Sequence, residues 1–529
     1  MFFRKGNDRM FYWILTALIL VTGSAGLAYG QAPVVDRAVK PREASKPPRP
    51  VPRSLSIPGV FDQTDLVETP RLDVQKLLAE DAAQTRLGPL RIGVIQEFPP
   101  IITTQDKWVE MKDGGILWTA WFRAPGAISI RLRVKPWAPL PGAELIVYDA
   151  RDHAQVYGPF THTTRRKSQE FWTPPIFSNE IRLEYYLPAR MKQHSDEAFL
   201  AVDAIANQYR PMPGTGSTDD RLQSVLGCHL DATCYTTEGD GVGALTWTSS
   251  PDHGWFFCSG AMLNRVPEDF TPLFATARHC GGDDGWSQQK VDSTFVFWRY
   301  QTPSCNDTPP DPSTLASTSV AILLVDDANT DYTLFGLESN VPGGLTYEGW
   351  DANYWPDGSV GARIIHHPAG THKRITFGTK TADETSCVEA WAYKIDIPHG
   401  SGEIEPGSSG APVFDNTNRV RGTASCATWG CDQDDYGQFG RLDVAYVLLK
   451  PYLYRVDSAE WDVYVDGSYT GWEEGTVTQP FNTVIEGAFA VRRGTAHTLY
   501  IEAGSYNEQI IIDKAMTVRS RNGVVILGQ

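Results

Sequence analysis

The sequence predicts a mainly β protein with two packed β-barrels, preceded by a β-sandwich-like domain and followed by a short parallel β-helix-like segment. Short runs of alternating apolar residues, separated by Gly and Pro turns, predict the strands, and helical periodicities are few. All eight cysteines lie between Cys228 and Cys431, which indicates one disulfide-bonded domain with cysteine-free neighbours. At 529 residues the chain is too long for a single compact core.

The N-terminal residues have the three parts of a secretory signal peptide. A basic start is followed by the apolar run Phe11–Val21 and by small residues ending at Gly30, after which we expect cleavage. The apolar run is shorter than the roughly 20 residues that span a bilayer, which argues against a membrane anchor. We expect no membrane span in the later residues either. The sequence therefore predicts a secreted, extracellular protein with disulfide bonds.

The formal net charge of the chain is −16. Nucleic acids and anionic membranes are polyanions, so an acidic protein surface gains no favourable Coulomb energy from them. We therefore expect neither as a partner.

Changes in composition divide the rest of the chain. The proline-punctuated stretch Lys40–Pro58 predicts an extended linker, because proline is incompatible with a helix interior or a central strand. The last residues resemble the opening coils of a right-handed parallel β-helix, a module that normally needs further coils to bury its face. The predicted segments are a signal peptide (1–30), a Pro-rich linker (31–86), a β-rich domain (87–215), the two-barrel domain (216–456) and the β-helix-like module (457–529).

The segment Gly407-Ser408-Ser409-Gly410 is a candidate nucleophile loop. Attack on a peptide carbonyl needs a hydroxyl held at a tight turn, with backbone N–H groups beside it for the developing oxyanion. The flanking glycines allow that turn, and the amides of Gly407 and Ser409 are candidate donors. Alone, Gly-Ser-Ser-Gly is a common loop sequence, so the assignment depends on residues that could activate Ser409.

A candidate general base is His279, which follows the apolar run Leu273–Ala275. A histidine beside a cysteine could also bind zinc. No partner residue with ligand spacing lies nearby, so we predict no metal and no other cofactor.

Asp331 stands at the start of an alternating strand and is the candidate carboxylate that orients His279. A turn residue before a strand is the alternative interpretation. Its rivals Asp326 and Asp327 lie in a run typical of a solvated loop. The chain order His279, Asp331, Ser409 is that of the double-β-barrel serine proteases, whereas α/β-hydrolases and subtilisins use other orders.

From Cys228 to Tyr454 the chain resembles the bacterial lysyl endopeptidases, a branch of the trypsin-like serine proteases. The matching stretches, besides the histidine motif, are Cys228–Cys234, Cys258–Gly260, Trp298–Gln301, Gly349–Asp351, Ile365–Pro368 and Glu405–Gly410. The resemblance implies a chymotrypsin-like double β-barrel and a serine endopeptidase that cleaves proteins or peptides through an acyl-enzyme. It assigns His279, Asp331 and Ser409 as the triad.

The same family pattern implies three disulfides. They are Cys228–Cys431, Cys234–Cys305 and Cys258–Cys280. Cys387 and Cys426 remain outside the pattern, and we expect them to form a fourth bridge near the substrate cleft. The alternative is two buried thiols, which is less common in secreted proteins.

The predicted specificity pocket departs from the family pattern. Lysine preference in the family resembles a pocket acid just before a Tyr-Gly-Arg motif, and Gly437 stands at that position here. Glu403 lies six positions before Ser409, where trypsins carry their own pocket acid, so a preference for a basic P1 residue is expected to depend on Glu403. Acids of the adjacent loop, namely Asp432, Asp434 and Asp435, are alternatives.

Two further positions lie near the predicted triad. Trp391 matches the aromatic residue of the family pocket, whereas Ser425 occupies the family's histidine position. Ser408 stands where mammalian-type zymogens need an aspartate to pair with a newly freed amine. We therefore expect an oxyanion site formed by the fold itself.

The stretch Leu87–Tyr209 resembles the propeptide of these proteases. This implies a folding assistant or inhibitor that is the chain's own partner, with a retained interaction domain as the alternative. We expect processing between Pro213 and Gly227, for example after Arg221.

Two other functions remain as alternatives. One is a catalytically weak binding protein that attaches to polysaccharide or a cell surface through the flanking β modules. The other is a secreted esterase or lipase. The serine motif is not the strand-to-helix Gly-x-Ser-x-Gly turn and the chain order differs, which argues against the esterase.

Overall fold

The computed structural model describes residues 32–528, except 43–48, 61–63, 84–88, 104–106, 165–167, 213–226, 237, 456–460, 493–496, 509, 511 and 513. The predicted signal peptide and the predicted processing region up to Leu226 lie outside the described residues. Apart from Ala32, the described residues belong to one compact unit, Pro33–Gln529. Within the described residues, no helix has the length and apolar character needed to cross a membrane.

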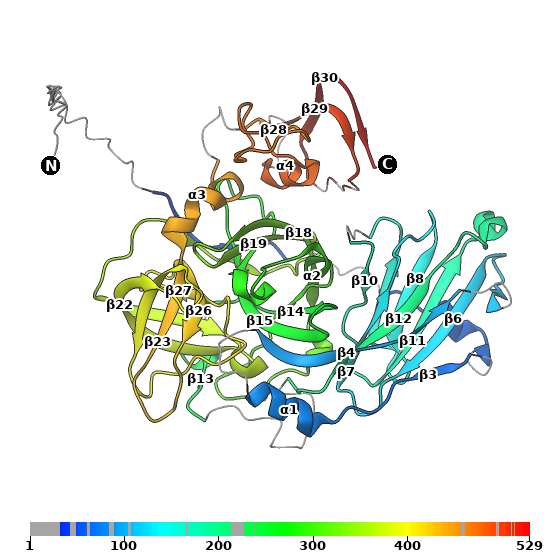
Figure 1. Ribbon diagram of the computed structural model, residues 1–529, viewed down its shortest axis with the longest axis horizontal. Coiled ribbons are helices and arrows are strands. Elements are labelled where there is room, and N and C mark those ends of the chain that lie inside the picture. Colours follow the sequence, from blue (N-terminus) through cyan, green and yellow to red (C-terminus); the bar gives the residue numbers. More distant parts are fainter. Residues whose placement is uncertain are drawn as a thin grey trace, which may run out of the picture. The chain divides into compact units, whose positions relative to one another are not determined.

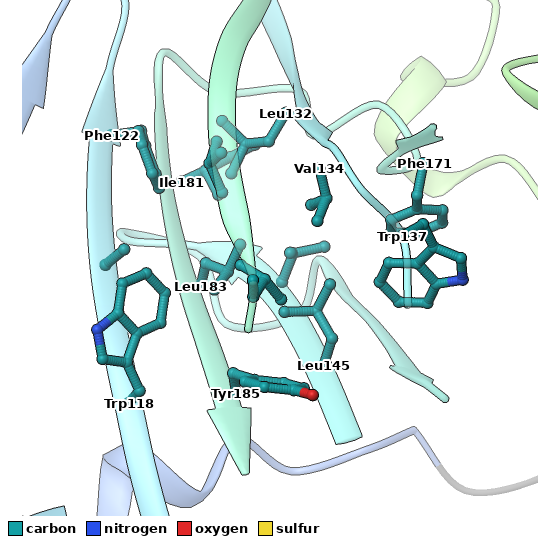
Figure 2. Close-up of a cluster of buried hydrophobic side chains, with 14 of the residues drawn as sticks. Trp118, Phe122, Leu132, Val134, Trp137, Leu145, Phe171, Ile181, Leu183 and Tyr185 are labelled. Atoms are coloured by element: carbon teal, nitrogen blue, oxygen red, sulfur yellow. The ribbon is translucent and has the colours of Figure 1, made fainter. Parts of the chain in front are cut away.

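Two sheets that share one core form the N-terminal domain. The first sheet has the order β3 (Leu66–Glu68), β6 (Ile116–Arg123), β11 (Glu180–Leu187), β8 (Glu144–Asp149) and β9 (Val156–Phe160), with β5 (Val109–Glu110) beside β6. The second contains β10 (Phe171–Trp172), β7 (Ser129–Val134), β12 (Ala201–Gln208) and β4 (Leu90–Ile102). Figure 2 shows Trp118 and Phe122 of β6, Leu132 of β7 and Ile181 of β11 in the buried core. The helix α1 (Val74–Ala82) precedes β4.

The first barrel closes from six antiparallel strands. Its strands are β14 (Val242–Ser249), β15 (Gly254–Leu263), β16 (Leu273–Ala277), β17 (Phe295–Trp298), β18 (Ser317–Asp327) and β19 (Tyr332–Leu337), drawn in shades of green in Figure 1. Pairing of β15 with β16 closes the ring. Leu245, Phe274, Val296 and Phe335 belong to its fully buried core. The short helix α2 (Gln288–Asp292) lies between β16 and β17 in the chain.

The second barrel also has six strands. They are β22 (Ser359–His366), β23 (Arg374–Thr385), β24 (Trp391–Ile397), β25 (Pro412–Phe414), β26 (Val420–Ala427) and β27 (Asp435–Arg441), and β26 pairs with β27 to close the ring. The helix α3 (Leu442–Leu453) follows directly. The fold is thus a mainly β, chymotrypsin-like double barrel, which confirms the predicted class.

Strand β4 joins the N-terminal domain to the first barrel. It pairs with β12 on one side and with β15 on the other, so one sheet of ten strands runs from β10 through β4 and β15 to β16. Buried Arg131 reinforces the junction, because its Nη2 donates to the carbonyl of Ser293 at 2.7 Å. Strand β4 is therefore held between β12 of the N-terminal domain and β15 of the first barrel.

The segment predicted as a Pro-rich linker differs from that expectation in its described parts. β1 (Val34–Val35) and β2 (Ala38–Val39) pair with β21 (Trp350–Asp351) and β20 (Thr346–Tyr347). A short 3-10 helix at Arg53–Ser56 presents two N–H groups to the carboxylate of Glu184, at 2.8 and 2.9 Å. β1 and β2 lie before the stretch Lys40–Pro58 for which an extended linker is predicted, whereas the 3-10 helix lies within it. The composition carried no signal of these long-range partners.

The C-terminal residues form a three-stranded parallel sheet. It consists of β28 (Val463–Val465), β29 (Thr498–Tyr506) and β30 (Thr517–Leu527). The helix α4 (Val484–Ala490) lies between β28 and β29 in the chain. Its Phe489 packs on β19, since a Cβ added to Gly336 would lie 2.4 Å from the Phe489 ring. Parallel pairing matches the predicted pattern of strands, and whether the module is a β-helix stays a prediction.

Candidate active site

The nucleophile loop is a tight turn between β24 and β25. Ser408 N donates to the carbonyl of Glu405 at 3.0 Å, and Gly410 N donates to the carbonyl of Ala424 at 2.8 Å. Gly407 has φ +100° and Gly410 has φ +78°, a region that side chains with a Cβ rarely adopt. A Cβ on Gly410 would also lie 2.1 Å from the Thr276 hydroxyl. Both glycines are therefore required by the backbone, as the motif predicts.

The first barrel holds this loop through Ser259 of β15. The N–H of Ser259 donates to the carbonyl of Ser409 at 2.8 Å, and its hydroxyl donates to the carbonyl of Gly407 at 2.9 Å. These two bonds fix the main chain on either side of Ser408 and leave the Ser409 side chain out of the contact. The loop of the second barrel is thus anchored to the wall of the first.

The carbonyls that precede the two candidate oxyanion donors are both hydrogen-bonded. The Pro406 carbonyl accepts from Ala369 N at 2.8 Å, and the Ser408 carbonyl accepts from Ala411 N at 2.9 Å. In a trans peptide the C=O and the following N–H point in opposite directions, so the amides of Gly407 and Ser409 point away from these partners. Within the described residues neither amide donates to a protein acceptor. Both remain available to a ligand oxygen.

His279 and Asp331 meet at the ends of neighbouring strands. His279 lies in the short 3-10 turn after β16, and Asp331 directly precedes β19, which pairs with β16. The Asp331 carboxylate accepts from His279 Nδ1 at 2.7 Å and from the His279 main-chain N–H at 2.8 Å. A carboxylate at Nδ1 favours the tautomer with the proton on Nδ1, so Nε2 is the basic nitrogen.

Buried Nε2 of His279 has no hydrogen-bond partner among the described residues, so no bond to Ser409 is formed in this structure. The nucleophile loop nevertheless packs against the strand that leads to His279, since a Cβ on Gly410 would lie 2.8 Å from Ala277 N. Hydrogen bonds of catalytic groups often tighten only when substrate binds. The structure places the loop that carries Ser409 beside the strand that leads to His279, and His279 beside Asp331.

The rival acids have other roles. Asp326 and Asp327 end β18 instead of lying in a solvated loop. Asp326 accepts from the Thr333 hydroxyl at 2.8 Å and lies 3.4 Å from Arg278. Burial raises the pKa of Asp326. The acidic run at Asp326 and Asp327 is typical of a loop, so the sequence did not predict that β18 extends to these residues.

Ser425 is a neighbour of Asp331 that the sequence did not reveal as such. Its hydroxyl donates to Asp331 Oδ2 at 2.6 Å and lies 3.2 Å from the hydroxyl of Ser386. Ser425 is the donor in both contacts, so its one proton lies between the charged carboxylate, the shorter contact, and the Ser386 oxygen. The two serines precede Cys426 and Cys387, which are joined by a disulfide. That bridge holds the serine pair beside Asp331.

The structure contains all four expected disulfides. They are Cys228–Cys431, Cys234–Cys305, Cys258–Cys280 and Cys387–Cys426. The third joins β15 to the His279 turn and so restrains His279 relative to the strand that binds the Ser409 loop. Among the described residues, no group of three His, Cys, Asp or Glu side chains is arranged to hold a metal ion.

Glu403 lies buried six residues before Ser409, with 2% of its surface exposed. Its carboxylate accepts from the N–H groups of Ile404 and Gly430, at 2.9 and 3.0 Å. Burial is the main cause that raises the pKa of Glu403 to about 7, and the charges of Asp435 and Glu405 add to it. No basic side chain is hydrogen-bonded to Glu403 among the described residues.

The other predicted pocket residues separate into two groups. Gly437 borders the same space, because a Cβ there would lie 2.9 Å from Ile404 and 2.7 Å from the Phe439 ring. Trp391 is exposed at the start of β24, and its main-chain N–H donates to Asn329. Asp434 is exposed and accepts from His399 N. Asp435, in contrast, is buried, and one of its carboxylate oxygens has no partner among the described residues.

A buried histidine stands under the nucleophile loop. His366 Nδ1 lies 2.7 Å from the Ser408 hydroxyl, and Ser408 accepts from Glu405 N at 3.3 Å. Burial, followed by the nearby His229 and His367, lowers the pKa of His366 well below its ordinary value, so the ring is neutral. Ser408 is thus held by a neutral partner from β22, and no carboxylate is needed at this position.

Comparisons with known proteins point to one family. A family model described as the lysyl endopeptidase C-terminal domain matches residues 223–439, and one described as the lysyl endopeptidase N-terminal domain matches residues 66–206. A lysyl endopeptidase from Pseudomonas aeruginosa is 27% identical over 356 residues, which are 63% of this chain and 74% of that protein.

Three solved proteases resemble part of the chain. A thermostable serine protease, AL20, from an extremophilic microorganism is 18% identical with a TM-score of 0.29 and covers 39% of this chain and 94% of its own. The Rv3671c protease from M. tuberculosis in its active form is 14% identical with a TM-score of 0.27, over 40% and 79%. The HtrA-type protease AlgWS227A with a tripeptide is 15% identical with a TM-score of 0.28, over 40% and 60%. Such TM-scores support no functional comparison.

Proposed function

This chain is a lysyl endopeptidase-like protein and a serine endopeptidase, and we propose that Ser409, His279 and Asp331 form its catalytic triad. The observation that carries the proposal is the pair of hydrogen bonds from His279 to Asp331, at 2.7 and 2.8 Å, which leaves Nε2 without a partner among the described residues. A nitrogen held in this way is suited to accept the proton of a serine hydroxyl.

In the proposed reaction the Ser409 hydroxyl attacks the peptide carbonyl carbon while His279 Nε2 takes its proton. Asp331 stabilises the imidazolium that forms, without accepting the proton itself. The amides of Gly407 and Ser409 donate to the oxyanion. His279 then gives the proton to the leaving amine, which departs and leaves the acyl group on Ser409. A water activated by His279 hydrolyses this ester and restores the enzyme.

We further propose that the pocket at Glu403 favours Lys or Arg at P1. Glu403 and Asp435 are two buried carboxyl groups; burial is the main cause that raises the pKa of Glu403, and the charge of Asp435 adds to it. A P1 ammonium or guanidinium would supply the opposite charge that this pocket lacks. Gly437 stands where the family has its pocket acid. Glu403, six residues before Ser409, would therefore supply the negative charge for a basic P1 side chain.

The proposal includes export and a pro-domain. Four disulfides are consistent with an oxidising compartment outside the cell. Strand β4 of the N-terminal domain pairs with the barrel that holds His279. We propose that this domain acts as the chain's own inhibitor or folding assistant.

Cleavage of a peptide library by the processed protein tests this function. We expect Lys or Arg at P1, and no cleavage by Ser409→Ala or His279→Ala variants that fold normally. Cleavage that persists in Ser409→Ala would contradict the triad. A P1 preference for small or apolar residues would contradict the role of Glu403 and leave the triad standing.

A further inference from the structure

The edge of β15 that faces away from β14 has three different neighbours in succession. Strand β4 pairs with Gly254–Phe257, the nucleophile loop binds Ser259, and β16 pairs with Ala261–Leu263. Along β15, therefore, the N-terminal domain and the candidate nucleophile are direct neighbours.

Strand geometry shows that β4 and the loop lie on the same edge. Ser259 N–H bonds to Ser409, so it faces away from β14. The N–H and C=O groups of successive residues in a strand point alternately to its two edges. Those of Phe257, two residues before Ser259, therefore point to the same edge as those of Ser259. The register partner of Phe257 is Leu90 of β4. Two residues span roughly 7 Å of strand. Leu90, the first residue of β4, thus pairs with β15 only two residues before the position that binds Ser409.

The direction of β4 is that of a leaving peptide. β4 runs antiparallel to β15, from Leu90 opposite Phe257 to Val94 opposite Gly254, so its chain leads away from Ser409. The part of a substrate that follows the scissile bond must also start at Ser409 and lead away from it. In the proposed function the P1 side chain of the substrate lies at Glu403 in the second barrel. The residues after the scissile bond would then lie along the first barrel, where β15 is the strand beside Ser409.

Building on the proposed function, we propose that β4 is a built-in occupant of the β15 edge on which the substrate residues after the scissile bond would pair. The N-terminal domain then blocks the site by occupying the place of the leaving peptide. Addition of an extended segment to an open strand edge is a general mode of peptide recognition. Here the chain itself supplies the segment.

The N-terminal domain holds β4 firmly in that place. On its other edge β4 pairs with β12 over much of its length. Arg131 of β7 donates through Nε to the carbonyl of Thr173 at 2.8 Å and through Nη2 to Ser293 of the protease region. Arg133 donates to the Ser250 hydroxyl at 3.0 Å, just before β15 begins. Such contacts maintain the position of β4 even if the connecting chain is cut elsewhere.

A pair of substrates tests the proposal without any mutation. Both carry the same acyl residues with Lys at P1. One ends in a small chromogenic amide, and the other continues for four residues after the scissile bond. Their hydrolysis is compared between the intact full-length chain, checked by intact mass before and after the assay, and the processed protein freed of its N-terminal domain. We expect the intact chain to be slower on the extended peptide by at least ~10-fold but within ~3-fold on the small amide, because only the former needs the strand edge.

Two matched variants locate the effect on β4. Leu90→Pro removes the N–H opposite Phe257 and should bring hydrolysis of the extended peptide by the intact chain close to that of the processed protein. Ile102→Pro, at the other end of the same strand, faces Ala201 of β12 and should not. If Leu90→Pro fails to fold, the substrate pair on the wild-type chain decides alone.

The outcomes separate this proposal from the proposed function. Equal slowing of both substrates in the intact chain, or extended-peptide hydrolysis as fast as in the processed protein, overturns the role of β4 alone. A processed protein that cleaves neither substrate overturns the proposed function, and with it the role of β4.

Discussion

The hydroxyl of Ser425 lies 2.6 Å from Asp331 Oδ2, the same oxygen that accepts from His279 Nδ1. Asp331 Oδ2 thus receives two donors, His279 from the turn after β16 of the first barrel and Ser425 from β26 of the second. The bond from Ser425 thus helps to fix the orientation of the Asp331 carboxylate.

Loss of this bond should slow catalysis without altering the fold. We expect Ser425→Ala to lower kcat about 10- to 100-fold, because a hydrogen bond to a charged group contributes roughly 1.5–3 kcal/mol. Ser386→Ala should have a smaller effect, since the Ser386 hydroxyl contacts Ser425 and the Ala390 N–H but not the carboxylate. In the Ser425→Ala background the Ser386→Ala change should have no further effect on kcat. If Ser386→Ala lowered kcat as much in the Ser425→Ala background as in the wild type, Ser386 would not act through Ser425.

Glycine 410 provides a test of the packing between the nucleophile loop and the first barrel. Gly410→Ala combines a left-handed φ with a clash against Thr276 and should lower the free energy of unfolding by about 2–5 kcal/mol, the sum of the usual costs of strain and overpacking. Gly400→Ala is the matched control. Gly400 has φ +79°, but no atom lies within 4 Å of an added Cβ. Its cost should be only the backbone cost of about 1–2 kcal/mol, measured by denaturant unfolding.

Glu403→Gln should change specificity selectively. Without the charge, kcat/KM for Lys or Arg at P1 should fall by at least ~10-fold, because the P1 cation loses its buried partner. For substrates with an apolar P1 residue, kcat/KM should stay within ~3-fold under the same assumption. A matched loss on both substrate classes would place Glu403 in the structural support of the loop and not in the pocket.

The raised pKa of Glu403 also predicts a pH dependence of stability. The group titrates at about 7 in the folded chain and near its ordinary value of 4.5 when unfolded. Between these values the folded state binds more protons, so the free energy of unfolding falls as pH rises from about 4.5 to 7. Glu403→Gln should remove that part of the fall. Denaturant unfolding of both proteins at pH 4.5 and pH 8 measures it, and identical pH profiles would contradict the assigned pKa.

Several features of the fold and the site followed from the sequence because they have local signals. Alternating apolar runs indicated the strands, and glycines at left-handed positions indicated the turn around Ser409. The order of His279, Asp331 and Ser409 suggested a double barrel, because chain order distinguishes the folds that use this chemistry.

Other features depend on partners that are distant in the chain. The pairing of β4 with β15 joins residues about 160 positions apart, and nothing in the sequence of Leu90–Ile102 specifies a partner outside its own domain. Ser425 was noted only as a departure from a family pattern, since a serine in a strand has no local sign of a carboxylate partner. Asp435 was one of several loop acids, and only burial distinguishes it from Asp434.

Covalent labelling of the processed protein with an organofluorophosphonate, followed by mapping of the modified peptide, tests the central assignment most directly. The account predicts one adduct, on Ser409, that is absent from a folded Ser409→Ala protein and strongly reduced in His279→Ala. An adduct on another residue, or equal labelling of Ser409→Ala, would contradict it.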